Sequence, residues 1–192
     1  MPRKVIIAGG MKLLPADIIF CKVGEAWLGR SIAWFTRAKG EAPTYAVHVA
    51  MIGLKYDVIE ADWTARAMEW KEWSKGRSFE VWRFNGLLKE ERETIASDAE
   101  WFVDRKIPYG WWEIIHQAAD GLLSKVVGGD RFFFRRLTKL DPDNPICSQL
   151  ISFPYARKNI LFGLKDPEYA NPDELMDYCQ GHLDEWAMVY GQ

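Results

Sequence analysis

The sequence predicts an α+β fold, and two observations support this prediction. Short runs rich in β-branched and aromatic residues gather in the first half of the chain. Longer segments with apolar residues at helical spacing dominate the second half. Strands and helices that are segregated in this way are typical of α+β proteins, whereas a regular alternation would indicate α/β. We expect a small antiparallel sheet packed against helices.

Four segments are predicted strands, because each is a short apolar run bounded by turn residues. The first of them is entered through Pro15, and a tight turn at 53–55 joins the second to the third as a hairpin. The predicted strands cover residues 16–23, 45–54, 57–62 and 78–85.

The predicted helices follow the 3.6-residue spacing of their apolar side chains. Gly128-Gly129 is a typical end signal for the third of them, and Pro145 a typical start signal for the fourth. The predicted helices cover residues 27–38, 90–106 and 111–127, a segment from about 145 onward, and 172–180.

The composition indicates one soluble domain covering residues 1–192. Apolar residues make up 48% of the chain and charged residues 27%, which is the profile of a globular protein. The net charge of −2 argues against a nucleic-acid partner, because no basic excess is present to neutralise phosphates. No stretch has the ~18 apolar residues of a membrane span, and the N-terminal apolar run is too short for a signal peptide. We therefore expect a cytoplasmic protein, or one exported by a route that the sequence does not show.

Three cysteines are spread along the chain without a Cys-x-x-Cys motif, so neither a disulfide scaffold nor a zinc site is expected. We expect no metal or organic cofactor. Cys21 lies within an apolar strand run and Cys179 in a late helix, and both are interpreted as packing residues. Cys147 differs from them in its local sequence.

Cys147 follows a helix-start signal. Asn144 is a typical N-cap and Pro145 suits the first helical position, so Cys147 is predicted in the first turn. Backbone N–H groups and the positive end of the helix dipole favour an anion there, which lowers the pKa of a thiol and also suits an oxyanion. The alternative interpretation is a small buried residue at the start of a core helix.

His48 interrupts an otherwise apolar strand and needs a polar partner if it is buried. A three-residue loop at 53–55 would set His48 directly opposite Glu60, on the same face of the hairpin. Glu60 would then orient the imidazole, and Asp62 is the reserve candidate. A two-residue loop would move Glu60 to the other face. The alternative interpretation is a structural histidine with a solvated Glu60.

Taken in chain order, several short motifs resemble the circularly permuted branch of the NlpC-type papain-like superfamily. The resemblance is to its YiiX-like group, which is related to the lecithin retinol acyltransferase family. The motifs are Pro-Ala-Asp-apolar at 15–20, the first helix at 27–36, His-Val-apolar at 48–52, Val-Ile-Glu-Ala at 58–61, Ile-Pro-Tyr-Gly at 107–110, Cys-Ser-Gln-Leu-Ile at 147–151 and Asn-Pro-Asp-Glu-Leu at 171–175.

The resemblance implies a permuted papain-like fold and a catalytic role for three residues. Cys147 would be the nucleophile, His48 the base and Glu60 the third polar residue. Tyr109 would lie near the thiol, and together with the start of the Cys147 helix at Ser148 it would hold the oxyanion. Two residues depart from the family pattern, with Ala16 in place of Gly and Gln149 in place of Glu.

The expected function is a cysteine-dependent hydrolase or acyl-transfer enzyme that forms a thioester intermediate. Its substrate would be an amide, in a peptide, an isopeptide or a peptidoglycan stem peptide. The alternatives are a lipid acyl ester and a non-catalytic binding module on the same fold. Four tryptophans could line an apolar groove for a lipid: Trp63, Trp70, Trp73 and Trp82. The simpler interpretation is that they pack in the core. The oligomeric state does not follow from the sequence.

Overall fold

A computed structural model describes residues 5–22, 45–62, 64–107 and 146–192. The predicted helices at 27–38 and 111–127 lie outside these residues, as do Tyr109 and Trp63. The fold below is the arrangement of the described residues.

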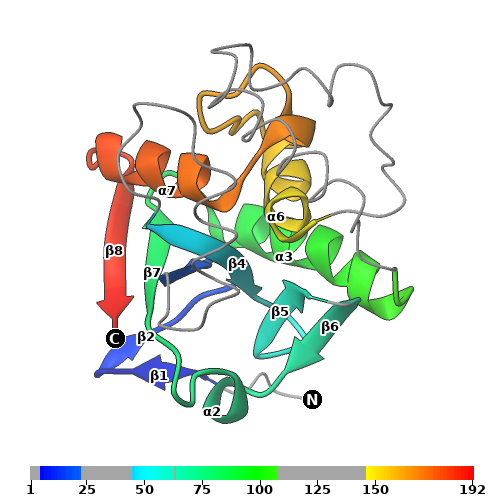
Figure 1. The fold of residues 1–192 in the computed structure, drawn as a ribbon, viewed down its shortest axis with the longest axis vertical. Coiled ribbons are helices and arrows are strands. Elements are labelled where there is room, and N and C mark those ends of the chain that lie inside the picture. The colour runs from blue at the N-terminus through cyan, green and yellow to red at the C-terminus, as the bar shows by residue number, and fades with distance from the viewer. Residues whose placement is uncertain (1–4, 23–44, 63, 108–145) are drawn as a thin grey trace, which may run out of the picture.

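A six-stranded antiparallel sheet forms the centre of the fold, with strand order β6-β5-β4-β3-β7-β8. A separate two-stranded sheet lies near the N-terminus (Figure 1). The strands of the large sheet are β3 (Ile18–Lys22), β4 (Ala46–Ile52), β5 (Val58–Ala61), β6 (Ala65–Met68), β7 (Phe79–Phe84) and β8 (Trp186–Gly191), and those of the small sheet are β1 (Ile7–Ala8) and β2 (Met11–Lys12).

Helices cover the large sheet unequally (Figure 1). One face carries α3 (Lys89–Asp104), α6 (Cys147–Ala156) and α7 (Pro172–Gly181), and the other carries the small sheet and the short α2 (Trp70–Trp73). Each face has its own cluster of buried apolar side chains. A 3₁₀ turn, η1 (Pro167–Tyr169), precedes α7. The α+β prediction is confirmed.

The four predicted strands form, as do the predicted helices that correspond to α3, α6 and α7. The sequence analysis missed β1, β2, β6, α2, η1 and β8. The Ala-Arg-Ala-Met sequence of β6 contains no β-branched or aromatic residue, so its extended form comes from pairing with β5 rather than from intrinsic preference.

The β4–β5 hairpin has a different register from the predicted one. Ala50 faces Glu60, so the connecting loop runs over residues 53–57 rather than 53–55. The predicted pairing of His48 with Glu60 is therefore wrong by two residues. Because the side-chain period of a strand is two, an even shift leaves Glu60 on the predicted face. Glu60 becomes a diagonal neighbour of His48.

A buried carboxylate on α3 accounts for the longer loop. Oε1 of Glu100 accepts the backbone N–H groups of Leu54, Lys55 and Tyr56 at 2.6, 2.6 and 3.3 Å. The close approach also requires a glycine, since a Cβ on Gly53 would lie 2.8 Å from both Glu100 Oε1 and the Tyr56 carbonyl oxygen. This long-range contact stabilises the loop that joins β4 to β5.

Ala16, which stands where the resembled family has glycine, adopts a left-handed backbone with φ of 62°. This region is favourable for glycine and costs other residues about 1–2 kcal/mol. The conformation is held because the Ala16 N–H donates to the Ile52 carbonyl at 2.9 Å and the Tyr155 hydroxyl donates to the Ala16 carbonyl.

Candidate active site

Helix α6 begins at Cys147, and its N-cap is Ile146. The predicted start at Asn144 and Pro145 is therefore two residues too early. The Ile146 N–H is satisfied by Gln149, whose Oε1 accepts it at 3.0 Å. Because this side chain provides the cap, Cys147 becomes the first residue of the helix, where the dipole acts most strongly on an anion.

Gln149 uses both ends of its amide. While Oε1 caps the helix, Nε2 donates to the Glu168 carbonyl at 2.9 Å, and the side chain is buried. An ionised glutamate accepts hydrogen bonds but donates none. Gln149 therefore suits a site where a carbonyl oxygen faces the side chain.

The residues around the Cys147 thiol are mostly buried. Cys147 itself is 5% exposed, and α6 packs against β4. The Ser148 hydroxyl is buried and donates to the Ala170 carbonyl at 2.7 Å, so an oxyanion contact from Ser148 would use its backbone N–H. Tyr109, the other predicted oxyanion residue, lies outside the described residues.

His48 lies beside an irregularity in the sheet. It faces Cys21 on β3, but the next pair is Lys22 with Ala46, so β4 carries one extra residue at this point. Ala46 and Val49 consequently share the helix-side cluster, which strict alternation would forbid. A bulge of this kind changes the direction of nearby side chains. It occurs here at the end of β4 that carries His48.

His48 interacts with both Glu60 and Cys147. Its Nε2 lies 3.0 Å from Oε2 of Glu60. Burial lowers the pKa of His48, but the hydrogen bond and the negative charge of Cys147, followed by the hydrogen bond of Glu60, raise this pKa well above 6.5. The same attraction favours the thiolate, because a charged imidazole stabilises an adjacent anion.

Glu60 is 1% exposed and accepts hydrogen bonds from three further side chains. Arg66 donates to Oε1 through Nε at 2.9 Å and Nη2 at 2.6 Å, Trp73 Nε1 donates to Oε2 at 2.8 Å, and Arg77 Nη1 lies 3.5 Å from Oε2. Burial raises the pKa of Glu60, but His48, Trp73 and Arg66 together lower it from 4.5 to about 2. The carboxylate is therefore ionised at neutral pH.

Asp62, the reserve acid, pairs with Arg66 at 2.9 Å and its side chain is 42% exposed. Among the contacts of the described residues, the carboxylate that reaches His48 belongs to Glu60. Glu60, the residue first predicted as the partner of His48, thus contacts it from a diagonal position and not from the directly opposite one.

Cys21 and Cys179 are both buried in apolar clusters, as predicted. Burial raises the pKa of each thiol. Cys21 also faces His48 across the β3–β4 pair, which the sequence analysis missed because it did not pair 16–23 with 45–54.

The tryptophans do not form an apolar groove where they are described. Trp73 and Trp82 are 0% and 4% exposed, and Trp70 stacks against Trp73 with ring centroids 6.1 Å apart. The groove interpretation is wrong for Trp73 and Trp82, and core packing is confirmed for them.

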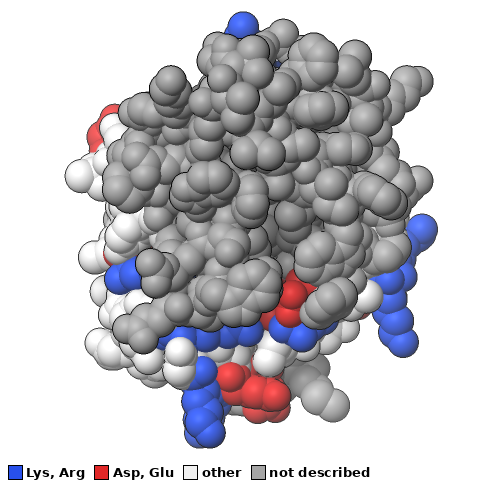
Figure 2. All heavy atoms as spheres, viewed as in Figure 1, with Lys and Arg blue, Asp and Glu red and all other residues white. Residues whose placement is uncertain are grey.

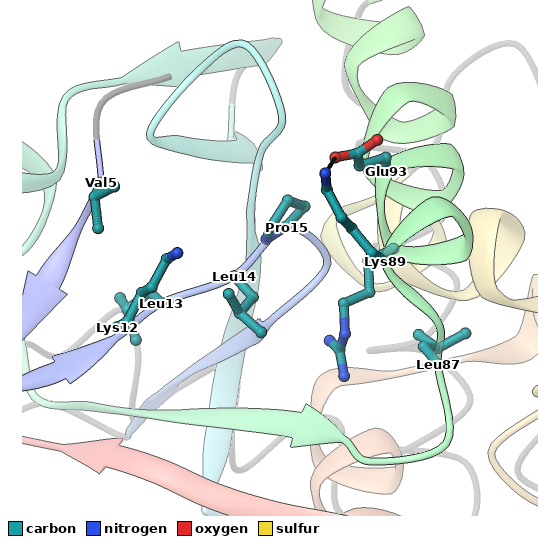
Figure 3. Close-up of a pocket in the computed structure, with 9 residues that line it drawn as sticks. Val5, Lys12, Leu13, Leu14, Pro15, Leu87, Lys89 and Glu93 are labelled. Carbon is teal, nitrogen blue, oxygen red and sulfur yellow. Dashed lines mark ion pairs between the residues drawn. The ribbon is translucent and has the colours of Figure 1, made fainter. Parts of the chain in front are cut away.

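A cavity of about 520 Å³ lies away from Cys147 and His48, between the β2–β3 connection and the start of α3 (Figure 3). Figure 3 shows Leu13, Leu14 and Pro15 on one side and Leu87 and Lys89 on the other. No residue of the Cys147–His48–Glu60 group lines it.

Among the described residues, Lys and Arg side chains lie beside Asp and Glu side chains at the lower edge of the face shown in Figure 2.

Within the same residues, no helix has the length and apolar character needed to cross a membrane. Nor do those residues contain three or more His, Cys, Asp or Glu side chains grouped as metal ligands.

Comparison with known proteins gives one similarity. No family model matches this chain, and no curated protein matches it. Among solved structures, the chain is similar to the crystal structure of metalloprotein yiiX from Escherichia coli O157:H7. The sequences are 17% identical, the match covers 93% of this chain and 97% of that one, and the TM-score is 0.49. The chemical assignment of the site therefore rests on the contacts described above.

Proposed function

We propose that this protein is a cysteine-dependent hydrolase or acyl-transfer enzyme, with Cys147 as nucleophile, His48 as base and Glu60 as the residue that orients His48. The observation that carries this proposal is that the His48 imidazole interacts with both Glu60 and Cys147. Glu60 occupies Nε2 of His48, which leaves Nδ1 for the Cys147 thiol, and the thiol is at the first residue of a helix. This is the relation between nucleophile, base and orienting acid that covalent catalysis requires.

The first half of the reaction forms a thioester. The Cys147 thiolate attacks the carbonyl carbon of an amide, and the carbonyl electrons move onto oxygen. Backbone N–H groups at the start of α6, from Cys147 and Ser148, would stabilise that oxyanion. When the oxyanion collapses, the C–N bond breaks and the His48 imidazolium gives its proton to the leaving amine.

The second half releases the acyl group. Neutral His48 takes a proton from water, the resulting hydroxide attacks the thioester carbonyl, and the C–S bond breaks to give the acid and the thiolate. If an amine or alcohol replaces water, the same step is an acyl transfer. Glu60 stays ionised throughout and stabilises the imidazolium.

We favour an amide substrate, in a peptide, an isopeptide or a peptidoglycan stem peptide. The residue-based argument for a lipid ester was a tryptophan-lined groove, and Trp73 and Trp82 are core residues instead. Incubation with muropeptides and with phospholipids, using Cys147→Ala as control, tests this choice. We expect product from muropeptides alone; product from phospholipids alone would reverse the assignment.

Alkylation of the three thiols by iodoacetamide tests the nucleophile without any substrate. At pH 6–7 we expect Cys147 to react at least ~10-fold faster than Cys21 and Cys179, with an apparent pKa below the ordinary value of about 8.5. Peptide mass spectrometry measures each rate, and unfolded protein provides the reference in which all three thiols are accessible.

The matched control is His48→Ala, which should return the apparent pKa of Cys147 toward about 8.5. Negligible labelling of Cys147, or a rate equal to those of the other two thiols, would instead support a non-catalytic binding module.

A further inference from the structure

Glu60 has more hydrogen-bond donors around it than the orientation of one histidine needs. Its two oxygens are used differently: Oε1 receives both N–H groups of the Arg66 fork, whereas Oε2 is shared between His48 and Trp73. Arg66 lies on β6 and Trp73 on α2, two elements outside the motifs that suggest the papain-like resemblance.

We propose that Arg66 and Trp73 are positioning residues, which keep the Glu60 carboxylate ionised and turned so that Oε2 meets Nε2 of His48. The inference rests on the proposed function, since it assigns these residues to the site that contains Cys147.

The first argument is burial. A carboxylate as enclosed as Glu60 is costly to keep charged unless hydrogen bonds and opposite charges compensate, and otherwise it takes up a proton. A protonated Glu60 would lose the negative charge that stabilises the imidazolium. Arg66 supplies a fixed positive charge through two N–H groups, and Trp73 supplies one neutral donor.

The second argument is geometry. Two N–H groups on one oxygen restrict the rotation of the carboxylate, which leaves Oε2 facing His48. The Trp73 indole is in turn held by Phe79, with ring centroids 5.2 Å apart, and by the Arg77 guanidinium, which stacks 4.8 Å from its centroid. The donor on Trp73 is therefore held in place by packing.

Other charged groups face the same atoms and enter the pH dependence. Arg77 adds a weaker positive contact to Oε2 of Glu60, and Asp62 pairs with the outer side of Arg66. Cys21 faces His48 from β3 and Cys147 faces it from α6. All of these groups remain when Arg66 or Trp73 is substituted, but Asp62 loses its partner in the Arg66 variant and Arg77 loses part of its stacking surface in the Trp73 variant.

The main test is Arg66→Met, which keeps much of the apolar stem and removes the charge and the fork. His48 is followed by NMR of its imidazole nitrogens from pH 7 to pH 2. We expect the acid transition that reports protonation of Glu60 to move upward by about 1–3 pH units. Arg66→Lys, which restores the charge without the fork, should restore part of the shift.

Trp73→Phe removes the indole N–H together with the smaller ring of the indole, and keeps one aromatic ring in the cluster. We expect a smaller shift in the same direction, because a neutral donor is weaker than a charged one. The matched control is Trp82→Phe, which removes the equivalent donor 3.0 Å from Oε2 of Glu80 and should leave the His48 transition unchanged.

The NMR transition of His48 can be measured in both variants without a substrate. It therefore tests the positioning role of Arg66 and Trp73 separately from the proposed enzymatic function. If no product is ever found but the His48 transition moves in Arg66→Met and Trp73→Phe, the positioning role stands without the enzyme. An unmoved transition in both variants, with melting temperatures showing that they fold, would overturn the positioning role whatever the activity.

Discussion

At the scale of single residues, two carboxylates lie two positions apart, but their environments differ. Glu60 is enclosed and contacts His48, whereas Asp62 is half-exposed and contacts Arg66. Exposed ion pairs contribute little to the stability of the fold, whereas a buried charge is destabilising unless its partners compensate for the lost solvation. The difference makes Glu60 and Asp62 a natural pair for comparison.

We predict that Glu60→Gln lowers the pKa of His48, because the negative charge beside Nε2 is lost. Alkylation of Cys147 at pH 6 should slow by about tenfold, the equivalent of one pKa unit. Asp62→Asn should change neither quantity comparably. Imidazole NMR and alkylation rates measure both effects, and equal effects of the two substitutions would show that Asp62 also acts on His48.

The sequence was sufficient to single out Cys147, His48 and Glu60 but not their contacts. Cys147 was found from a helix-start signal and His48 from a polar residue in an apolar strand. Glu60 was selected from a predicted strand register that is wrong by two residues. Because side chains alternate with a period of two along a strand, Glu60 still lies on the predicted face of the hairpin. Arg66 and Trp73 gave no local signal, because their importance arises from the carboxylate that they meet.

At the scale of elements, the β4–β5 hairpin is positioned by α3. Three backbone N–H groups of its loop converge on Glu100, a residue more than forty positions later in the chain. The loop connects the strand that carries His48 to the strand that carries Glu60. Helix α3 is therefore part of the support of the candidate site.

We predict that Glu100→Gln lowers the free energy of unfolding by about 1–3 kcal/mol, since a charged acceptor of three backbone N–H groups is replaced by a neutral one. Glu93→Gln is the control on the same helix, because the contact of Glu93 among the described residues is a 3.8 Å pair with the exposed Lys89. Urea denaturation measures both variants. A similar, small loss in both would contradict a role of Glu100 in the hairpin.

At the scale of the whole molecule, buried acids couple stability to pH in opposite directions. The pKa of Glu60 is lowered to about 2 in the folded protein, so its contribution is present above pH 4.5 and is lost as the pH falls toward 2. Burial raises the pKa of Asp17, against the opposing effect of Arg83, so ionisation of Asp17 reduces stability instead.

We predict an acid-sensitive stability for this protein. The Glu60 shift corresponds to about 3 kcal/mol between neutral pH and pH 2, at about 1.4 kcal/mol per pKa unit. Urea denaturation at pH 7, 5 and 3 should show a decline below pH 4.5 that is shallower in Glu60→Gln. An identical decline in both proteins would assign the acid sensitivity to other groups.

The sequence by itself determined the α+β class, the existence of the strands β3 and β4, and the placement of Cys147 and His48 on a helix and a strand. These features depend on local periodicity and capping, which neighbouring residues encode. Only the tertiary structure decided the hairpin register, the strand β6 and the group of donors around Glu60. Each of these depends on contacts between residues distant in the chain, and the free energy of such contacts exists only when the fold brings the partners together.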